Sequence, residues 1–397
     1  MRIHAPAFIA ACLGTFACHA PARGPVDVSG EIDRVLARHG IPALAGAIVT
    51  TDGLTGIGVA GDRASDRDDP VLPGDSFHLG SCTKAMTATL IAILVEDNLL
   101  TWDTTLEQAL PDIAPEMHEG FKSVTVADLL VQRSGVPADM SANGVWAGLW
   151  AGRGSLVDQR RECARVMLAQ PPSHDRSRFV YANANFILAG HIAEVAAGEP
   201  WEDLMRSRLF TPLGMTTAGF GAPGSAEHPD APRGHRPDGT SAGFGRGADN
   251  PPALGPAGTV HASLEDWGKF VSFHLRGAKA AREGLGLDIG GVEIRPRTWS
   301  RLHTPVRGEG GDYAMGWRAT ERSWAQAPQG KPTVLTHAGS NTMWYCVVWA
   351  APEAGFAVLS ASNAATDAAQ KACDEVSGML IKAHRAARDQ NAPPADR

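Results

Sequence analysis

The 397-residue sequence predicts a mixed α/β (α+β) fold, in which one sheet closed by both ends of the chain carries an inserted helical lobe. Strand-like segments occur near residues 43–61 and again near 333–360, helix-like segments fill the middle, and we find no internal repeat. We therefore expect one catalytic domain over residues 23–390. Its sheet lobe would span about 28–97 and 260–388, and its helical lobe about 98–259. Apolar content of 44% and charged content of 20% are ordinary for a globular protein.

Residues 1–22 are predicted to be a signal peptide. Arg2 supplies a short positive region, residues 5–17 are apolar and small, and Ala20-Pro21-Ala22 offers a small-residue cleavage site. Ile9-Ala10-Ala11-Cys12 also resembles a lipoprotein processing site. We expect an exported protein, periplasmic or secreted, whose only membrane attachment would be a lipid anchor, because no later apolar run reaches the roughly 20 residues that span a bilayer.

Charge and cysteine usage exclude several function classes. A net charge of −7 without a Lys/Arg-rich run argues against nucleic acid as a partner. No Cys-x-x-Cys or His-Glu-x-x-His spacing occurs, so neither a metal nor another cofactor is expected. The four cysteines outside the signal are predicted to be buried apolar residues, with a single bridge as the alternative: Cys82, Cys163, Cys346 and Cys373.

The first elements are read from caps, turns and apolar runs. Ser29 is expected to cap a helix over Glu31–His39 that ends at Gly40. A buried strand over 43–51, a turn at Asp52-Gly53 and a second strand over 54–61 form a hairpin. A helix is expected from Ser81 to Asp97.

The remaining elements follow from the same patterns. Helices are predicted over 127–131, 155–170, 183–197 and 202–209, followed by a Gly- and Pro-rich loop over 217–258. Strands are predicted over 333–336, 343–350 and 356–360, then a closing helix over 365–385. Residues 391–397 are expected to form a disordered tail.

Ser81 and Lys84 form the single Ser-x-x-Lys in the chain, where an extended run gives way to a helix. Residues three apart share one helix face, so the hydroxyl and the amine would be neighbours. A hydroxyl is a poor nucleophile while it keeps its proton, and an adjacent amine can remove that proton. The free N–H groups at the start of a helix also favour negative charge that develops there. The pair predicts a nucleophilic serine.

Two further motifs could complete a site. Tyr181-Ala182-Asn183 lies at a predicted loop–helix junction, where a phenol could relay protons if a neighbouring ammonium lowered its pKa. Spacing alone favours a structural tyrosine over this catalytic interpretation. His337-Ala338-Gly339 follows a β-rich run, and a glycine there lets substrate approach the backbone. His-x-Gly also occurs at residues 78–80 and 118–120, so its sequence context alone distinguishes this copy.

Taken in order, these motifs resemble the serine β-lactamase and penicillin-binding-protein superfamily, in its class C-like branch of hydrolases. The resemblance runs along almost the whole mature chain, through the segments 77–84, 99–103 with 110–111, 124–130, 134–137, 181–183, 212–215, 257–259, 313–317 and 337–339. It implies a β-lactamase/transpeptidase-like fold, with an antiparallel sheet flanked by helices.

The resemblance also implies roles. Ser81 would be the acylated nucleophile, Lys84 would take or steer its proton, and Tyr181 would serve as acid and base. Asn183, His337 and Gly339 would contact substrate. The backbone N–H groups of Ser81 and Ser340 would form an oxyanion hole, in which each donor is worth about 3 kcal/mol.

Three positions depart from the usual pattern. Most lactamases and transpeptidases of this superfamily have Lys-Thr-Gly where this chain has His337-Ala338-Gly339. A histidine of ordinary pKa is mostly neutral at pH 7, so it is a weaker anchor for a substrate carboxylate. Gln132-Arg133 replaces the common His-Thr, and Ser340-Asn341-Thr342-Met343-Trp344 lacks a further glycine, which suggests a more crowded pocket rim. We attribute these two departures to packing, with substrate specificity as the alternative.

The sequence therefore predicts an exported serine hydrolase that forms an acyl-enzyme on Ser81 and cleaves ester or peptide-like amide bonds. The alternatives are a true β-lactamase or DD-carboxypeptidase, and a catalytically silent penicillin-binding sensor. Gly239-Thr240-Ser241-Ala242-Gly243 fits a nucleophile elbow, but no strand precedes it and no helix follows, so we predict a loop. The expected partner is a small-molecule or peptide-like substrate.

Overall fold

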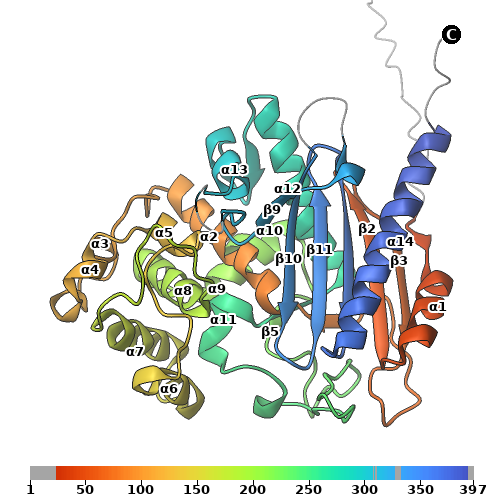
Figure 1. Cartoon of the computed structure of the whole chain (residues 1–397), viewed down its shortest axis with the longest axis horizontal. Helices are drawn as coiled ribbons and strands as arrows, with labels where there is room; N and C mark the ends of the chain where they lie inside the picture. The colour runs from red at the N-terminus through yellow and green to blue at the C-terminus, as the bar shows by residue number, and fades with distance from the viewer. Residues whose placement is uncertain (1–23, 307, 309–310, 327–331, 392–397) are drawn as a thin grey trace, which may run out of the picture.

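A seven-stranded sheet, to which both ends of the chain contribute, lies in the right part of the molecule as drawn in Figure 1. The computed structural model describes residues 24–306, 308, 311–326 and 332–391. The strand order is β1 (Val26–Asp27), β3 (Gly53–Gly61), β2 (Ala43–Thr50), β12 (Phe356–Ser362), β11 (Tyr345–Ala351), β10 (Thr333–Ser340) and β9 (Arg318–Glu321). All neighbours pair antiparallel except β1 and β3. The predicted α/β fold with an antiparallel sheet is confirmed.

Helices cover both faces of this sheet. The helices α1 (Ser29–His39) and α14 (Asp367–Asn391) pack on one face over a core that includes Ile32, Val358 and Val376. The helix α12 (Leu264–Arg282) packs on the other face. Because both faces are covered, β12 is buried along its whole length and its sequence is a continuous run of small and apolar residues.

The first helix is held differently from the prediction. Its N-cap residue is Val28, and Ser29 makes no side-chain cap. Ser29 Oγ instead accepts a hydrogen bond from the Val59 N–H at 3.2 Å, which ties α1 to β3. The predicted end is correct: Gly40 adopts φ +61, a conformation that glycine reaches without a Cβ clash.

The middle of the chain is helical, as predicted. After β4 (Ser76–His78), a 3₁₀ turn over Gly80–Cys82 leads into α2 (Thr83–Glu96). The following helices are α3 (Leu106–Ala109), α4 (Glu119–Lys122), α5 (Val126–Leu130), α6 (Val145–Ala151), α7 (Leu156–Leu168), α8 (Asn183–Ala197), α9 (Trp201–Met205) with a π-helical turn over Arg206–Phe210, and α10 (Thr211–Leu213). Residues 217–258 hold only β5 (Gly219–Phe220), 3₁₀ turns and α11 (Gly255–Gly258).

Several elements were not predicted from the sequence. They include the short helices α3, α4 and α6, and also β6 (Val260–Ser263), α12, α13 (Pro296–His303), the hairpin β7 (Leu287–Ile289) with β8 (Val292–Ile294), and β9. A signal for α12 was present, because Leu264, Trp267, Val271 and Leu275 recur at helical spacing and all four are buried. The strand β10 also runs to Ser340 rather than ending at Thr336, so His337 and Gly339 lie within it.

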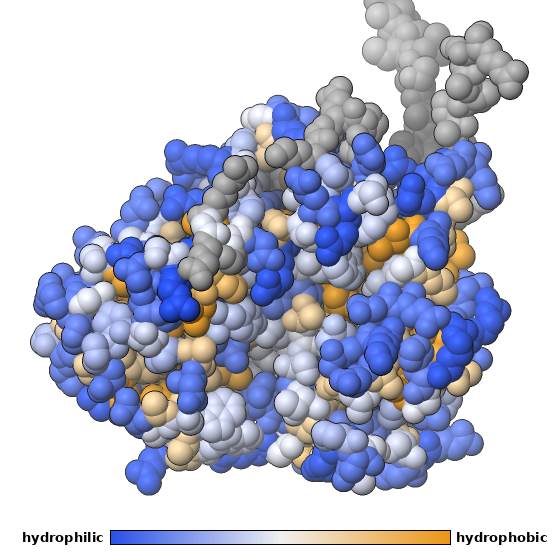
Figure 2. All heavy atoms as spheres, in the orientation of Figure 1, coloured by the Kyte–Doolittle hydropathy of each residue, from blue (hydrophilic) through white to orange (hydrophobic). Residues whose placement is uncertain are grey.

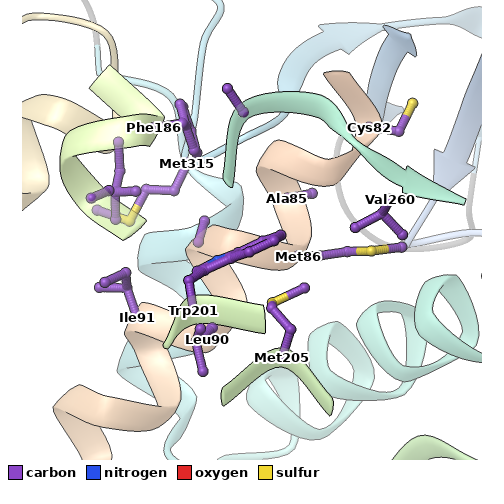
Figure 3. Close-up of a cluster of buried hydrophobic side chains, with 14 of the residues drawn as sticks. Cys82, Ala85, Met86, Leu90, Ile91, Phe186, Trp201, Met205, Val260 and Met315 are labelled. Atoms are coloured by element: carbon purple, nitrogen blue, oxygen red, sulfur yellow. The ribbon is translucent and has the colours of Figure 1, made fainter. Parts of the chain in front are cut away.

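The helix α2 runs through the interior and is buried over residues 83–94. Figure 3 shows Met86 and Leu90 of α2 among Trp201 and Met205 of α9 and Val260 of β6. Such a helix has no need of a polar face, because other parts of the protein surround it on all sides. Its first turn is therefore fixed by packing from both lobes.

The surface is hydrophilic in the view of Figure 2, with apolar side chains in small separate patches. No helix among the described residues could cross a membrane. Residues 1–22, the predicted signal peptide, lie outside the described residues, as does the predicted tail apart from Asn391, the last residue of α14. Four cysteines are buried free thiols, as predicted: Cys82, Cys163, Cys346 and Cys373.

Candidate active site

Ser81 lies in the turn between β4 and α2, pressed against the end of β10. Gly80 adopts φ +47, and a Cβ on it would lie 2.4 Å from the Ser340 N atom. Likewise, a Cβ on Gly339 would lie 2.0 Å from the Leu79 O atom and 3.0 Å from Ser81 N. Both glycines are therefore needed for the two backbone segments to touch, and this contact brings Ser81 and Ser340 together.

Lys84 lies on the next turn of the same helical segment, with its amine directed at Ser81. Its Nζ atom is 3.0 Å from Ser81 Oγ, 2.7 Å from Asn183 Oδ1 and 2.6 Å from the Ala257 O atom. The side chain is fully buried, and these three partners carry no net charge. Burial lowers the pKa of Lys84 to about 7, because the charged form loses hydration that no carboxylate replaces among these partners.

The partners of Lys84 determine where its lone pair points when it is neutral. The Asn183 and Ala257 oxygens are carbonyl oxygens and can only accept hydrogen bonds. A neutral amine has two N–H groups, and those two acceptors use both of them. The lone pair is then left to face the Ser81 hydroxyl, which is the geometry that a general base requires.

Tyr181 and Asn183 are brought to the same place by the start of α8. Asn183 is the first residue of α8, and the Lys84 Nζ atom lies 4.9 Å from the centroid of the Tyr181 ring. Burial raises the pKa of Tyr181, and a hydrogen bond with Ser81 only partly offsets this effect. The direction is opposite to the lowering that a phenolate would need, so Tyr181 keeps its phenolic proton at neutral pH.

Gln132 contacts the segment that carries Tyr181 and Asn183, and its side chain is fully buried. Its Oε1 atom accepts hydrogen bonds from the Ala182 N–H at 3.0 Å and from Asn185 Nδ2 at 2.6 Å. Ala182 stands between Tyr181 and Asn183, so Gln132 holds the backbone that aims both side chains. The attribution of Gln132 to packing agrees with this position.

His337 lies in β10 with its ring buried and both nitrogens occupied. Nδ1 is 2.6 Å from the Ala338 O atom, and Nε2 is 3.2 Å from the hydroxyl of Tyr313. Because a carbonyl can only accept, Nδ1 carries the proton and Nε2 accepts from Tyr313. Burial, with a smaller contribution from the charge of Lys84, lowers the pKa of His337 to about 3. The ring is neutral at pH 7, and both of its nitrogens bond to protein groups.

Tyr313 was not singled out from the sequence, although it lies in one of the segments that carry the resemblance. Its ring packs edge-on against Tyr181 at 6.1 Å and against His337 at 5.9 Å between centroids. The three rings form one aromatic wall beside Ser81. Tyr313 being one of only three tyrosines in the chain was the available signal.

The Gly-x-Ser-x-Gly segment around Ser241 and a separate cavity both lie apart from this cluster. Ser241 sits in a loop, without a strand before it or a helix after it, so the elbow is absent as predicted. A cavity of about 1030 Å³ is lined by α7, α9 and the loop over 220–252, with Asp249 and Thr259 in its wall but not Ser81. Within the described part of the chain, no cluster of His, Cys, Asp and Glu could hold a metal ion.

Comparison with known proteins agrees with this arrangement. The family model described as Beta-lactamase matches residues 28–376. The unguisins hydrolase ungD' of Aspergillus campestris is 27% identical over 349 residues, which are 85% of this chain and 61% of that protein. Penicillin-binding protein 4 of Amycolatopsis lactamdurans is 36% identical over 141 residues, 35% of this chain and 34% of that protein. The chain thus spans less than two thirds of these relatives.

Solved structures show the same fold at low identity. The D-alanine carboxypeptidase AmpC of Burkholderia cenocepacia superposes with a TM-score of 0.65 at 20% identity, over 88% of this chain and 97% of that one. A class C beta lactamase from Rhodobacter sphaeroides gives a TM-score of 0.67 at 18% identity, over 89% and 98%. Because the family model covers most of the chain and the fold is shared, this protein belongs to the Beta-lactamase family of hydrolases.

Proposed function

We propose that the protein is a serine hydrolase that forms an acyl-enzyme on Ser81 and hydrolyses ester or peptide-like amide bonds. The observation that carries this proposal is the buried amine of Lys84, 3.0 Å from Ser81 Oγ and with a pKa of about 7. A base is most effective when its pKa lies near the working pH. Few structural roles would require a lysine to be buried without a carboxylate beside it.

The chemistry follows from the positions of these groups. The Ser81 proton moves to the lone pair of Lys84 Nζ, while Oγ attacks the substrate carbonyl carbon and its oxygen becomes an oxyanion. The N–H groups of Ser81 and Ser340 receive that charge. When the tetrahedral intermediate collapses, Lys84 returns the proton to the leaving group, directly or through the protonated Tyr181. Water then attacks the acyl carbon and gives a proton to Lys84. Collapse of this second intermediate breaks the bond to Ser81 Oγ, which takes that proton back from Lys84 as the acid product leaves. Asn183, whose Oδ1 is held by Lys84, directs Nδ2 to the substrate.

The environment of His337 supports esters or peptide-like amides over β-lactams. A neutral ring with both nitrogens bonded inside the protein supplies no positive charge for the carboxylate of a β-lactam or a D-Ala-D-Ala terminus. The name of the related unguisins hydrolase agrees with a hydrolytic reaction. A true β-lactamase or DD-carboxypeptidase is the second candidate, because relatives of the same fold carry those names.

Covalent labelling tests the proposal. A fluorophosphonate probe should label the wild type and Ser241→Ala but not Ser81→Ala; the reverse pattern would refute Ser81 as the nucleophile. Turnover of p-nitrophenyl esters, D-amino-acid amides and nitrocefin then separates the classes. Rapid nitrocefin turnover beside negligible ester and amide hydrolysis would make the protein a β-lactamase, and labelling without any turnover would make it a sensor.

Export remains a proposal that rests on the composition of residues 1–22. Mass analysis of the mature N-terminus tests it. A chain that begins near residue 23 would indicate signal cleavage, a lipid-modified Cys12 would indicate anchoring, and an intact Met1 on the mature protein would contradict export.

A further inference from the structure

We propose that Asp249 is a positioning residue for the oxyanion hole, because its carboxylate joins the turn that carries Ser81 to the strand end that carries Ser340. The inference rests on the proposed function, in which the N–H groups of those two serines receive the developing charge. Asp249 lies in the long Gly- and Pro-rich loop, after a 3₁₀ turn over Arg246–Ala248, and is almost entirely buried.

One arm of the connection runs through His78 to the residue before the nucleophile. The Gly80 N–H donates to His78 Nδ1 at 3.1 Å. An N–H group can only donate, so Nδ1 is the acceptor and the neutral ring carries its proton on Nε2. Nε2 lies 3.0 Å from Asp249 Oδ2 and therefore donates to it. The carboxylate thus selects the tautomer of His78 that can accept from Gly80.

The other arm runs through Asn341 to the residue after Ser340. Asn341 Nδ2 donates to Asp249 Oδ1 at 2.8 Å, so the amide oxygen Asn341 Oδ1 faces the turn that follows β10. That oxygen accepts the N–H groups of Met343 at 3.2 Å and Trp344 at 3.1 Å. The turn after β10, which includes Thr342 at φ +74, is held in this way.

The two arms end on backbone segments that are already in contact. A Cβ on Gly80 would lie 2.4 Å from Ser340 N, and a Cβ on Gly339 would lie 3.0 Å from Ser81 N. The donors of an oxyanion hole must stay near hydrogen-bond distance of one atom, and a misplacement of about 1 Å can cost about 100-fold in rate. One carboxylate that accepts from both arms fixes the separation of the two donors.

The experiment compares two substitutions of Asp249 with a matched buried aspartate. Asp266 accepts hydrogen bonds from the Thr217 backbone, the Thr217 hydroxyl and Lys269, all at 2.6 Å, and none of these groups belongs to either arm. We expect Asp249→Ala to lower the maximal rate of fluorophosphonate labelling of Ser81 by about 10- to 100-fold, with the half-saturating probe concentration changed less than about 3-fold. Asp249→Asn should lie between, because its amide N–H₂ faces one of the two donors. Asp266→Asn should label at the wild-type maximal rate.

Hydrogen exchange gives a second measurement that does not depend on activity. Asp249→Ala should lose amide protection in residues 78–82 and 340–344 together, while the rest of the chain keeps it. The proposal is overturned if Asp249→Ala is labelled at the wild-type maximal rate. It is also overturned if Asp266→Asn loses as much of that labelling rate as Asp249→Ala does. If the wild type itself is not labelled at Ser81, the proposed function fails, and the hydrogen-exchange result alone tests the role of Asp249. Joint loss of protection in the two segments of Asp249→Ala then supports the link through Asp249. Unchanged protection overturns it.

Discussion

Acylation of Ser81 should depend on pH through the amine of Lys84, with a midpoint near pH 7. A lysine in water has a pKa of about 10.5, so roughly one amine in 3,000 is neutral at pH 7. Burial lowers the pKa of Lys84 to about 7, which makes roughly half of the amines neutral at that pH. The packing around Lys84 therefore increases the population of the base about a thousand-fold.

The sign of the dependence follows from the role of the amine. Only neutral Lys84 accepts the Ser81 proton, so the labelling rate should rise with pH, from roughly 10% of its plateau at pH 6 to roughly 90% at pH 8. The assay is the second-order rate of fluorophosphonate labelling between pH 5 and 9. Lys84→Arg keeps a positive charge at all these values, so its plateau should fall by about 10²- to 10⁴-fold and the pH limb should vanish.

A control separates Lys84 from the neighbouring histidine. The pKa of His337 is about 3, so His337 does not titrate between pH 5 and 9, and His337→Gln should keep the midpoint near 7. A flat profile between pH 6 and 8, a midpoint above 9, or a limb that survives Lys84→Arg would refute the reasoning. In the last case another group would be the base.

Three further outcomes are expected. Gly339→Ala should abolish labelling of Ser81 while the protein stays folded by circular dichroism, because the added Cβ would lie 2.0 Å from the Leu79 O atom; normal labelling would show that the two segments can separate. Arg160→Met should lower the free energy of unfolding in urea by about 3–5 kcal/mol, since the fully buried guanidinium binds two glutamates that would lose their partner; a change below about 1 kcal/mol would contradict this. Burial lowers the pKa of His303 to about 4, so this histidine binds a proton between pH 6.5 and 4 in unfolded chains but not in folded ones. His303 should therefore lower the free energy of unfolding by up to about 3 kcal/mol as the pH falls from 6.5 to 4. His303→Gln should show a smaller decrease than the wild type in urea unfolding at these two pH values.

Local sequence patterns predicted most elements that have a strong local signal. The helix over 183–197 and the hairpin around Asp52-Gly53 have the predicted places, because capping, turn chemistry and apolar spacing act within a few residues. The cap at Ser29 was wrong, since a backbone donor from β3 competes for its hydroxyl. The end of β10 was underestimated because His337 and Gly339 have little strand propensity of their own, and pairing with β11 extends the strand through them.

Contacts between distant segments had no local signal. Asp249 lies in a loop whose composition indicated only irregular structure, yet it binds His78 and Asn341. The backbone oxygen of Ala257, which binds Lys84, carries no side-chain signature at all. The pairing of His337 with Tyr313 likewise depends on where β10 lies relative to residues 311–317.

The sequence by itself determined that Ser81 and Lys84 are neighbours, because three residues of helix place two side chains on one face whatever surrounds them. Only the tertiary structure decided the pKa of the Lys84 amine, and so whether it can act as a base. Lys84 would be an ordinary ammonium group on an exposed helix. It becomes an amine with a pKa of about 7 because distant segments exclude water from it and offer it the carbonyl oxygens of Asn183 and Ala257 instead of a carboxylate.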